Sequence, residues 1–377
     1  MKAGLILVLI IVIGSAVFLF SKQNTTPEIN VPITTTGTNS STTTPDPNRK
    51  DIEVIADSLN IPWEIVFLPS GEMLITERPG TLLKIGTDRQ QIKVQGVHHV
   101  GEGGLLGVAL HPDFELNQYL YLYLTSQENG AVVNRVERYK FDGNSLSDRQ
   151  VILQGIKGSS NHDGGRIKFG PDGYLYIATG DAENPNSAQD TSSLNGKILR
   201  VSAEGSIPND NPFRNAVYSY GHRNVQGLAW DEQGKLWATE HGPSGLQTGN
   251  DELNLIEKGN NYGWPTIKGD QIQSEMITPI IQSGNNDTWA PSGAAYQNGS
   301  IFFAGLRGAT LYEAKLEGEK ITQLVKHFEN EYGRLRTVGI GPEGDLYFLT
   351  NNTDGRGRAN KNDDKLIRIN PEILDLQ

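Results

Sequence analysis

Residues 165–179, with the sequence GRIKFGPDGYLYIAT, decide the fold because they contain a complete β-hairpin. A short apolar strand, residues 165–169, leads into the turn Gly170-Pro171-Asp172-Gly173, and an alternating strand returns over residues 174–179. Proline presets the backbone of a turn, and glycine adopts the positive φ that tight turns need. The stretch therefore predicts two antiparallel strands joined by a tight turn.

The same two-strand unit recurs about six times along the chain, at a spacing of roughly forty to sixty residues. The other turns are Pro69-Ser70-Gly71, His111-Pro112-Asp113, Asp231-Glu232-Gln233-Gly234, Gln297-Asn298-Gly299 and Gly341-Pro342-Glu343-Gly344. Short strands, Gly/Pro turns and tyrosine-rich second strands are typical of β-propellers. We expect an all-β, six-bladed β-propeller over residues 51–377, closed by strands near 52–56 and 366–369 that share one blade.

The repeat also predicts a site. In an antiparallel hairpin, the start of the first strand and the end of the second lie at one edge of the sheet. The expected neighbours are Asn161-His162 with Gly180-Asp181, Arg223-Asn224 with His241-Gly242-Pro243, Pro291-Ser292 with Leu306-Arg307, and residues 334–336 with Asn351-Asn352. Radial blades would bring all of these to one end of a shared axis.

Composition excludes some classes of function. The chain has 377 residues, a formal net charge of −11 and no cysteine. Without a long basic run to offset this charge, nucleic acid is excluded as a partner. Without cysteine there are neither disulfides nor thiolate metal ligands.

The N-terminal segment predicts an exported protein. Residues 3–20 form an apolar run of about bilayer length between Lys2 and Lys22. We expect residues 1–23 to be an uncleaved transmembrane anchor, with a signal peptide as the alternative, and residues 24–50, rich in Thr, Ser and Pro, to be a disordered stalk. The predicted location is extracytoplasmic and membrane-anchored, and Asn24 and Asn39 begin N-glycosylation patterns that make a glycoprotein possible.

His162 is the first candidate for chemistry. A loop histidine can accept a proton near neutral pH, and a carboxylate partner fixes its tautomer. Asp181, across the hairpin, is positioned to be that partner. A structural histidine–aspartate pair is the alternative.

Two further sets of residues suggest ligands. Gly242-Pro243, Asp251-Glu252 and Tyr262 make an oxygen-rich stretch of the kind that Ca²⁺ prefers, although a solvated loop would have the same composition. Four arginines fall on the predicted shared end, and they would need an anionic ligand or carboxylates to neutralise them. They are Arg223, Arg307, Arg334 and Arg336.

The chain resembles the soluble sugar dehydrogenases that depend on pyrroloquinoline quinone (PQQ), and within them the aldose sugar dehydrogenase branch. The resemblance extends from about Ile52 to Pro371. It is carried by Gly103-Gly104-Leu105-Leu106-Gly107, His111-Pro112-Asp113-Phe114, His162 with Gly180-Asp181, Gly221-His222-Arg223-Asn224, Glu240-His241-Gly242-Pro243, Asp251-Glu252-Leu253-Asn254-Leu255-Ile256 and Gly259-Asn260-Asn261-Tyr262-Gly263-Trp264-Pro265.

The resemblance implies a reaction and a role for each matching residue. An aldose would be oxidised at its anomeric carbon to a lactone, with hydride passing to PQQ and electrons to an external acceptor. His162 would be the base and Asp181 its orienting partner, with Arg223 beside them. Contacts to PQQ would come from Glu102, Arg223, Asn224, Thr288, Arg307, Arg334 and Arg336. Gly242 and Pro243 would bind a catalytic Ca²⁺ through main-chain carbonyls, and Glu252 and Tyr262 a structural Ca²⁺.

The sequence departs from the family pattern at two positions. Glu102 stands where many members carry Gln, so it either adds a negative charge beside PQQ or is protonated there. Arg307 replaces a Lys of the glucose dehydrogenase branch, which preserves the charge but not the geometry. The loops after Asp181 and Pro243 look short, which favours an open site with loose sugar specificity.

Two other functions fit parts of the pattern. A calcium-dependent lactonase on a propeller would use Ca²⁺ and a histidine but would not need the arginines. A non-enzymatic cell-surface binding propeller that has lost PQQ would keep Glu252 and Tyr262 for structure.

Overall fold

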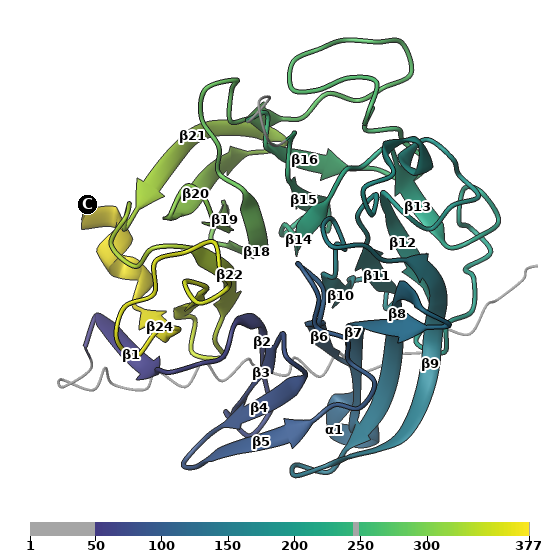
Figure 1. The fold of residues 1–377 in the computed structure, drawn as a ribbon. Helices are drawn as coiled ribbons and strands as arrows, with labels where there is room; N and C mark the ends of the chain where they lie inside the picture. Colours follow the sequence, from purple (N-terminus) through teal and green to yellow (C-terminus); the bar gives the residue numbers. More distant parts are fainter. Residues whose placement is uncertain (1–49, 244–248, 377) are drawn as a thin grey trace, which may run out of the picture. The chain divides into compact units, whose positions relative to one another are not determined.

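The structure is a computed structural model that describes residues 50–243 and 249–376. These residues belong to one compact unit, Lys50–Gln377. Within this unit the chain forms six four-stranded antiparallel sheets arranged around a central axis (Figure 1). The predicted six-bladed β-propeller is therefore confirmed.

Five of the blades are continuous in sequence, and each runs from an inner to an outer strand. The first two comprise β2 (Pro62–Phe67), β3 (Met73–Glu77), β4 (Thr81–Ile85) and β5 (Arg89–Lys93), then β6 (Leu105–Leu110), β7 (Tyr119–Glu128), β8 (Ala131–Phe141) and β9 (Leu146–Lys157). The next two comprise β10 (Ile167–Phe169), β11 (Leu175–Ala178), β12 (Lys197–Val201) and β13 (Val217–Tyr220), then β14 (Val225–Trp230), β15 (Leu236–Glu240), β16 (Glu252–Ile256) and β17 (Ile281–Gln282). The fifth comprises β18 (Pro291–Gln297), β19 (Ser300–Gly305), β20 (Thr310–Glu317) and β21 (Lys320–His327).

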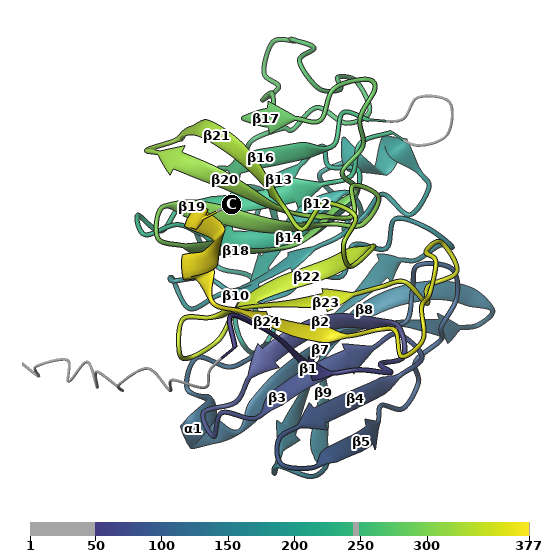
Figure 2. The same cartoon turned by 90° about the vertical axis from the view of Figure 1, so that its left-hand side faces the viewer.

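The sixth blade closes the ring with strands from both ends of the propeller. Its strand order is β1 (Ile52–Ala56), β24 (Leu366–Ile369), β23 (Leu346–Thr350) and β22 (Leu335–Ile340). Strand β1 pairs antiparallel with β24, with Ile52 opposite Ile369 and Val54 opposite Ile367. Figure 2 shows these strands side by side. The predicted closure is confirmed, and no disulfide is involved.

The aromatic strands are buried on both faces because neighbouring blades pack against each other. In β7, Tyr121, Leu122 and Tyr123 are all fully buried. The ring of Tyr121 meets the edge of Phe169, from the next blade, at 5.1 Å between centroids. These aromatic side chains therefore form part of the packing between blades.

The six inner strands all run in the same direction along the channel. Each predicted turn follows the C-terminal end of an inner strand, so the turns lie at one mouth and the strand starts at the other. One connection differs from the prediction. The turn at His111-Pro112-Asp113 is not a tight hairpin, because the single-turn helix α1 (Phe114–Asn117) extends it before β7 begins.

The remaining helical segments are short 3₁₀ turns at Pro185–Ala188 and Pro371–Leu376. Across the part of the chain that the structure describes, none of the helices has the length and apolarity needed to cross a bilayer. The predicted anchor, residues 1–23, and the predicted stalk up to residue 49 lie outside the described residues, together with Asn24 and Asn39. Those expectations stay predictions.

The closing blade allows a matched test of ring closure. Ile367 is fully buried, whereas its cross-strand partner Val54 is 50% exposed. We expect Ile367→Ala to lower the free energy of unfolding by about 2–5 kcal/mol, because it leaves a cavity in the core. The control Val54→Ala should cost less than about 0.5 kcal/mol. Urea denaturation measures the free energy of unfolding of both variants. Equal losses of stability would show that the buried side chain of Ile367 does not stabilise the closing blade.

Candidate functional site

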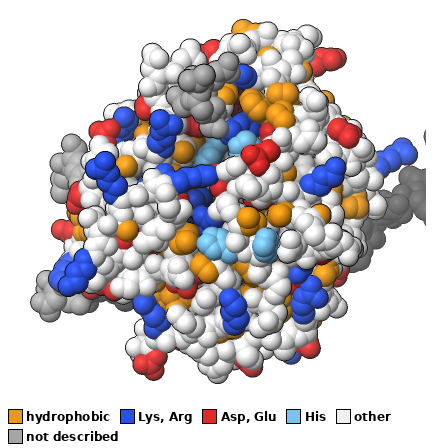
Figure 3. All heavy atoms as spheres, viewed as in Figure 1, with side chains coloured by type: hydrophobic (Ala, Val, Ile, Leu, Met, Phe, Trp, Pro, Cys, Tyr) orange, Lys and Arg blue, Asp and Glu red, His pale blue; other side chains and the backbone are white. Residues whose placement is uncertain are grey.

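A cavity of about 370 Å³ lies at the mouth of the channel where the inner strands begin. Figure 3 shows the face of the molecule in which arginine and histidine side chains gather around a central hollow. The residues lining the cavity include Trp63, Glu102, Asn161, His162, Glu183, Arg223, Gln226, His241, Gly242, Pro243, Asp251, Thr288, Arg307, Arg334, Arg336 and Arg356. They come from all six blades, as the repeat predicted.

His162 and Asp181 meet as predicted. The Nδ1 atom of His162 lies 2.8 Å from an Asp181 carboxylate oxygen, and the other oxygen accepts a hydrogen bond of 2.9 Å from the Trp264 indole. Asp181 is 1% exposed, so its orientation is fixed by these partners. Gly180 permits the close approach of the two loops, because a Cβ there would overlap the carbonyl oxygen of His162.

The other ring nitrogen of His162 is held by Arg223. The guanidinium lies 2.8 Å from Nε2. Because a guanidinium can only donate, Nε2 must carry the lone pair, and the ring proton is on Nδ1, facing Asp181. His162 lines the cavity, and its Nε2 carries the lone pair, so the ring is able to take a proton from a bound molecule there.

The four predicted arginines all line the cavity, but their partners differ. Arg334 pairs with Asp354 at 2.9 Å, and Arg307 is exposed at the rim. Arg336 donates to Gln226 at 2.8 Å and to Asn351 at 3.1 Å, both uncharged. Burial, together with the nearby charge of Arg78, lowers the pKa of Arg336 to about 9. The cavity therefore has a cationic wall that its own carboxylates only partly neutralise.

Glu102 is charged rather than protonated. Burial alone would raise its pKa, but the hydrogen bond and charge of Arg356, the charge of His241 and a backbone hydrogen bond from His162 lower it to about 2. The His162 N–H donates to one carboxylate oxygen at 2.9 Å, and Arg356 binds the other. Arg356 also donates to Asn161 at 2.8 Å, so it bridges two blades over the cavity.

Asp251 organises the side of the cavity that carries Gly242 and Pro243. One of its oxygens accepts from the Gly242 N–H at 2.8 Å. The other accepts from the Thr288 hydroxyl at 2.9 Å and from two backbone N–H groups, those of Trp289 and Ala290. Asp251 thus fixes both Gly242 and Thr288, the two residues expected to contact ligands.

Glu252 and Tyr262 lie apart from the cavity, around Glu240. Glu252 is the direct cross-strand partner of Glu240. Burial, together with the Glu240 charge, raises the pKa of Glu252 to about 8. The Tyr262 hydroxyl donates to the Leu255 carbonyl at 2.7 Å, so a metal would have to use another atom of Tyr262. Two opposed buried carboxylates are a place where a cation would relieve repulsion.

Asn224 does not line the cavity. It is fully buried, and its side-chain oxygen accepts from the Gly164 N–H at 3.0 Å, while its Nδ2 has no hydrogen-bond partner within the described part of the chain. Asn224 holds the loop that carries His162, and the contact with PQQ that the resemblance implied stays a prediction.

Several residues of the site were not predicted from the sequence. Arg356 belongs to Gly355-Arg356-Gly357 in the loop before β24, which returns to the site end of the blade. Its position after Asn351-Asn352 was the available signal. Trp264 and His241 stood inside recognised motifs, but only their contacts assign them a place. The buried Nε2 of His241 has no hydrogen-bond partner among residues 50–243 and 249–376, and burial lowers the pKa of His241 to about 4.

Comparisons with known proteins agree with this site. The model of the glucose/sorbosone dehydrogenase family matches residues 59–368. The aldose sugar dehydrogenase YliI of Escherichia coli is 33% identical over 361 residues, which cover 86% of this chain and 94% of that protein. A solved structure of the PQQ-bound aldose sugar dehydrogenase from Streptomyces coelicolor is 41% identical, with a TM-score of 0.79, over 84% of this chain and 97% of that one. Quinoprotein glucose dehydrogenase B of Acinetobacter calcoaceticus is 36% identical over 258 residues, 58% of this chain and 53% of that protein.

Fold and relatives together define a propeller dehydrogenase of the quinoprotein type, acting on sugars. The chain belongs to the glucose/sorbosone dehydrogenase family. The resemblance inferred from the motifs is confirmed.

The Glu102–Arg356 pair can be measured by a double-mutant cycle of Glu102→Gln and Arg356→Gln, read as free energies of unfolding. Because the Arg356 side chain is 53% exposed, we expect a coupling of only about 0.5–1 kcal/mol at pH 7. The folded pKa of Glu102 is depressed, so the contribution is present above pH 4.5 and is lost as the pH falls through about 2.

The exposed pair Lys326–Glu329 is the matched control for this cycle. Its coupling should be close to zero. A Glu102–Arg356 coupling no larger than that of the control would show that the bridge contributes nothing.

Proposed function

We propose that this enzyme oxidises aldose sugars at the anomeric carbon to lactones, using PQQ and Ca²⁺, and passes the electrons to an external acceptor. The observation that carries the proposal is the Nε2 atom of His162, which Asp181 and Arg223 hold at the wall of an arginine-lined cavity. The proposal includes an extracytoplasmic location with an N-terminal anchor, as the apolar run of residues 3–20 suggests.

The residues present fit PQQ. Its three carboxylates require cationic partners, and Arg223, Arg307, Arg334 and Arg336 supply them around one cavity. The Nε atoms of Arg334 and Arg336 are buried and have no hydrogen-bond partner among the residues that the structure describes. A charged Glu102 beside an anionic cofactor would be unfavourable alone, and Arg356 offsets that charge.

The residues around Gly242 fit a hard cation. A Cβ at this position would overlap the carbonyl oxygens of Gly249 and Asn250, so backbone oxygens crowd the glycine, and the carboxylate of Asp251 binds its N–H. No cluster of three or more metal-ligating side chains exists within residues 50–243 and 249–376. Ca²⁺ would therefore depend on main-chain oxygens, as Gly242 and Pro243 were expected to provide.

The chain's own residues supply the acid–base part of the reaction. When bound, PQQ supplies the two-electron acceptor for a hydride and Ca²⁺ supplies a Lewis acid. His162 takes the proton of the anomeric hydroxyl at Nε2, and Asp181 stabilises the imidazolium that forms. Arg223 must release Nε2 when the sugar hydroxyl takes its place, and the His241 carbonyl, 3.4 Å from the guanidinium, gives it another acceptor.

The alternatives differ in what they require. A calcium-dependent lactonase would turn over without PQQ, and a binding propeller would not turn over at all. The partly neutralised arginine wall favours oxidation over both, because neither alternative calls for a polyanion.

Reconstitution tests the oxidation. Full-length protein with PQQ and Ca²⁺ should reduce an artificial electron acceptor when an aldose is added. His162→Ala should lose at least about 10²-fold in kcat, because general-base catalysis typically contributes that much. The variant should still bind PQQ, as measured by the absorbance of the bound cofactor. His98→Ala, outside the cavity, is the control. Full activity in His162→Ala would show that the base is another group, and turnover of a lactone without PQQ would favour the hydrolase.

Glu252 tests the second metal. Its folded pKa is raised, so its contribution to stability is complete below pH 4.5 and is lost as the pH rises through about 8. Ca²⁺ should therefore raise the melting temperature more at pH 9 than at pH 6. Glu252→Gln should remove that difference, whereas the exposed control Glu317→Gln should keep it. Thermal unfolding measures these melting temperatures. If Glu252→Gln responds to Ca²⁺ as the wild-type protein does, the metal binds elsewhere.

A further inference from the structure

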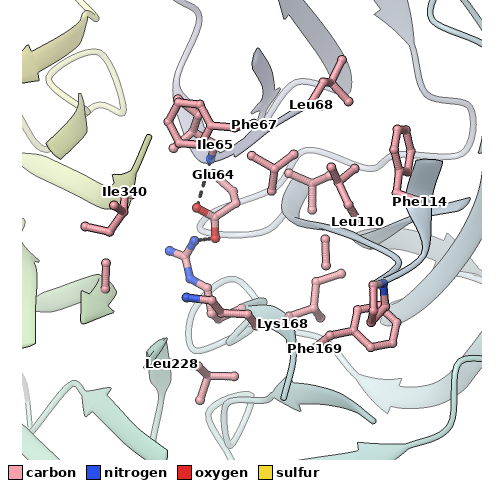
Figure 4. Close-up of a pocket in the computed structure, with 18 of the residues that line it drawn as sticks. Glu64, Ile65, Phe67, Leu68, Leu110, Phe114, Lys168, Phe169, Leu228 and Ile340 are labelled. Carbon is pink, nitrogen blue, oxygen red and sulfur yellow. Dashed lines mark hydrogen bonds and ion pairs between the residues drawn. The ribbon is translucent and has the colours of Figure 1, made fainter. Parts of the chain in front are cut away.

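A second cavity, of about 760 Å³, lies at the opposite mouth of the channel from His162 (Figure 4). It is surrounded by the C-terminal ends of the six inner strands, where the predicted turns begin. The buried side chains of Trp63 and Arg166 lie between the two cavities, with the guanidinium 4.0 Å from the Trp63 ring centre. Sugar oxidation makes no use of this second cavity.

The wall of the second cavity is largely apolar. Figure 4 shows Leu110, Phe114, Leu228 and Ile340 around a centre that Glu64 and Lys168 face. A volume of this size accommodates a small organic ligand, and apolar walls with one or two polar groups are typical of such sites.

The Glu64 carboxylate, which faces the channel, already has partners. Glu64 accepts hydrogen bonds of 3.0 Å from the Thr337 hydroxyl and from the Ile65 N–H on one oxygen, and its other oxygen pairs with Arg166. Arg166 also donates from Nε to the Gln226 carbonyl at 2.8 Å. The charges of Glu64 and Arg166 thus neutralise each other, although the Nη2 atom of Arg166 has no hydrogen-bond partner among the residues that the structure describes.

Lys168 is left without a counter-ion. It lies two residues after Arg166, is exposed to the cavity, and makes no hydrogen bond or ion pair with any residue that the structure describes. Although the side chain is open to the cavity, the surrounding walls of the channel partly desolvate it and, together with the Arg166 charge, lower its pKa to about 8, so most of it stays protonated at neutral pH. The other titratable groups lining the cavity are His111, whose pKa burial lowers, Tyr296, whose pKa burial raises, and the exposed Glu115 on α1. The inner part of the channel therefore has an excess of positive charge.

We propose that this cavity binds a small amphipathic carboxylate, whose anionic group pairs with Lys168 and whose hydrocarbon body packs against Leu110, Phe114 and Ile340. The pairing gives Lys168 the counter-ion that the chain does not provide, and the apolar wall gains contacts in place of water. The proposal does not depend on the sugar chemistry at the other mouth.

Calorimetric titration of the full-length protein with 4-phenylbutyrate, and with the uncharged 4-phenylbutan-1-ol, tests the proposal. The acid should bind at one site per chain, more tightly than the alcohol. Lys168→Gln should weaken the acid about tenfold or more, as expected for a charge-assisted hydrogen bond, and leave the alcohol nearly unchanged. Lys140→Gln, an exposed lysine of β8, should change neither.

A second variant keeps the test decisive. Ile340→Asp should weaken both compounds, because it places a charge on the apolar wall, and Lys168→Met should repeat the loss of the acid if Lys168→Gln fails to fold. Absence of binding to the wild-type protein, or an equal affinity for the acid in Lys168→Gln, would overturn the proposal. So would a dimer in sedimentation that Ile340→Asp dissociates, since a second copy would then cover this mouth.

Discussion

Pairing between β1 and β24 is the interaction on which the rest of the structure depends. It joins the two ends of the propeller in one blade, with Val54 opposite Ile367. Closure in this way covers the outer edge of β24 with β1, and every blade packs between two neighbours. Only a closed ring brings six separate loops to one mouth, so the site exists because the ring closes.

At that mouth, burial and charge act against each other. Arg223 and Arg336 are almost fully buried, and both have lowered pKa values because burial disfavours their charge. The Arg336 guanidinium donates to Gln226 and Asn351, which are uncharged and cannot balance its charge. Such a site is costly to the free protein and is pre-organised for a polyanion. The buried arginine charges therefore both lower the stability of the free protein and favour the binding of a polyanion.

Glu102 shows how the same logic applies to a carboxylate. A buried carboxylate beside an anionic cofactor would be repelled, yet here it is held in the charged form by Arg356 and by the His162 N–H. It therefore positions the loop that carries the base. Two blades that are distant in the sequence are connected through this one side chain.

The sequence by itself determined the repeat, the direction of each hairpin and hence which residues share an end. That was sufficient to predict six blades, the closing strands and the pairing of His162 with Asp181, because β-hairpin geometry is local. Only the tertiary structure decided the contacts between blades. Arg356 reaches Glu102 across 254 positions of sequence, and Asn224 turns into the interior although its neighbour Arg223 faces the cavity. The isolated charge of Lys168 likewise follows from which groups surround it in the closed ring. Such contacts depend on how rigid sheets pack side by side, and no local pattern of residues encodes that packing.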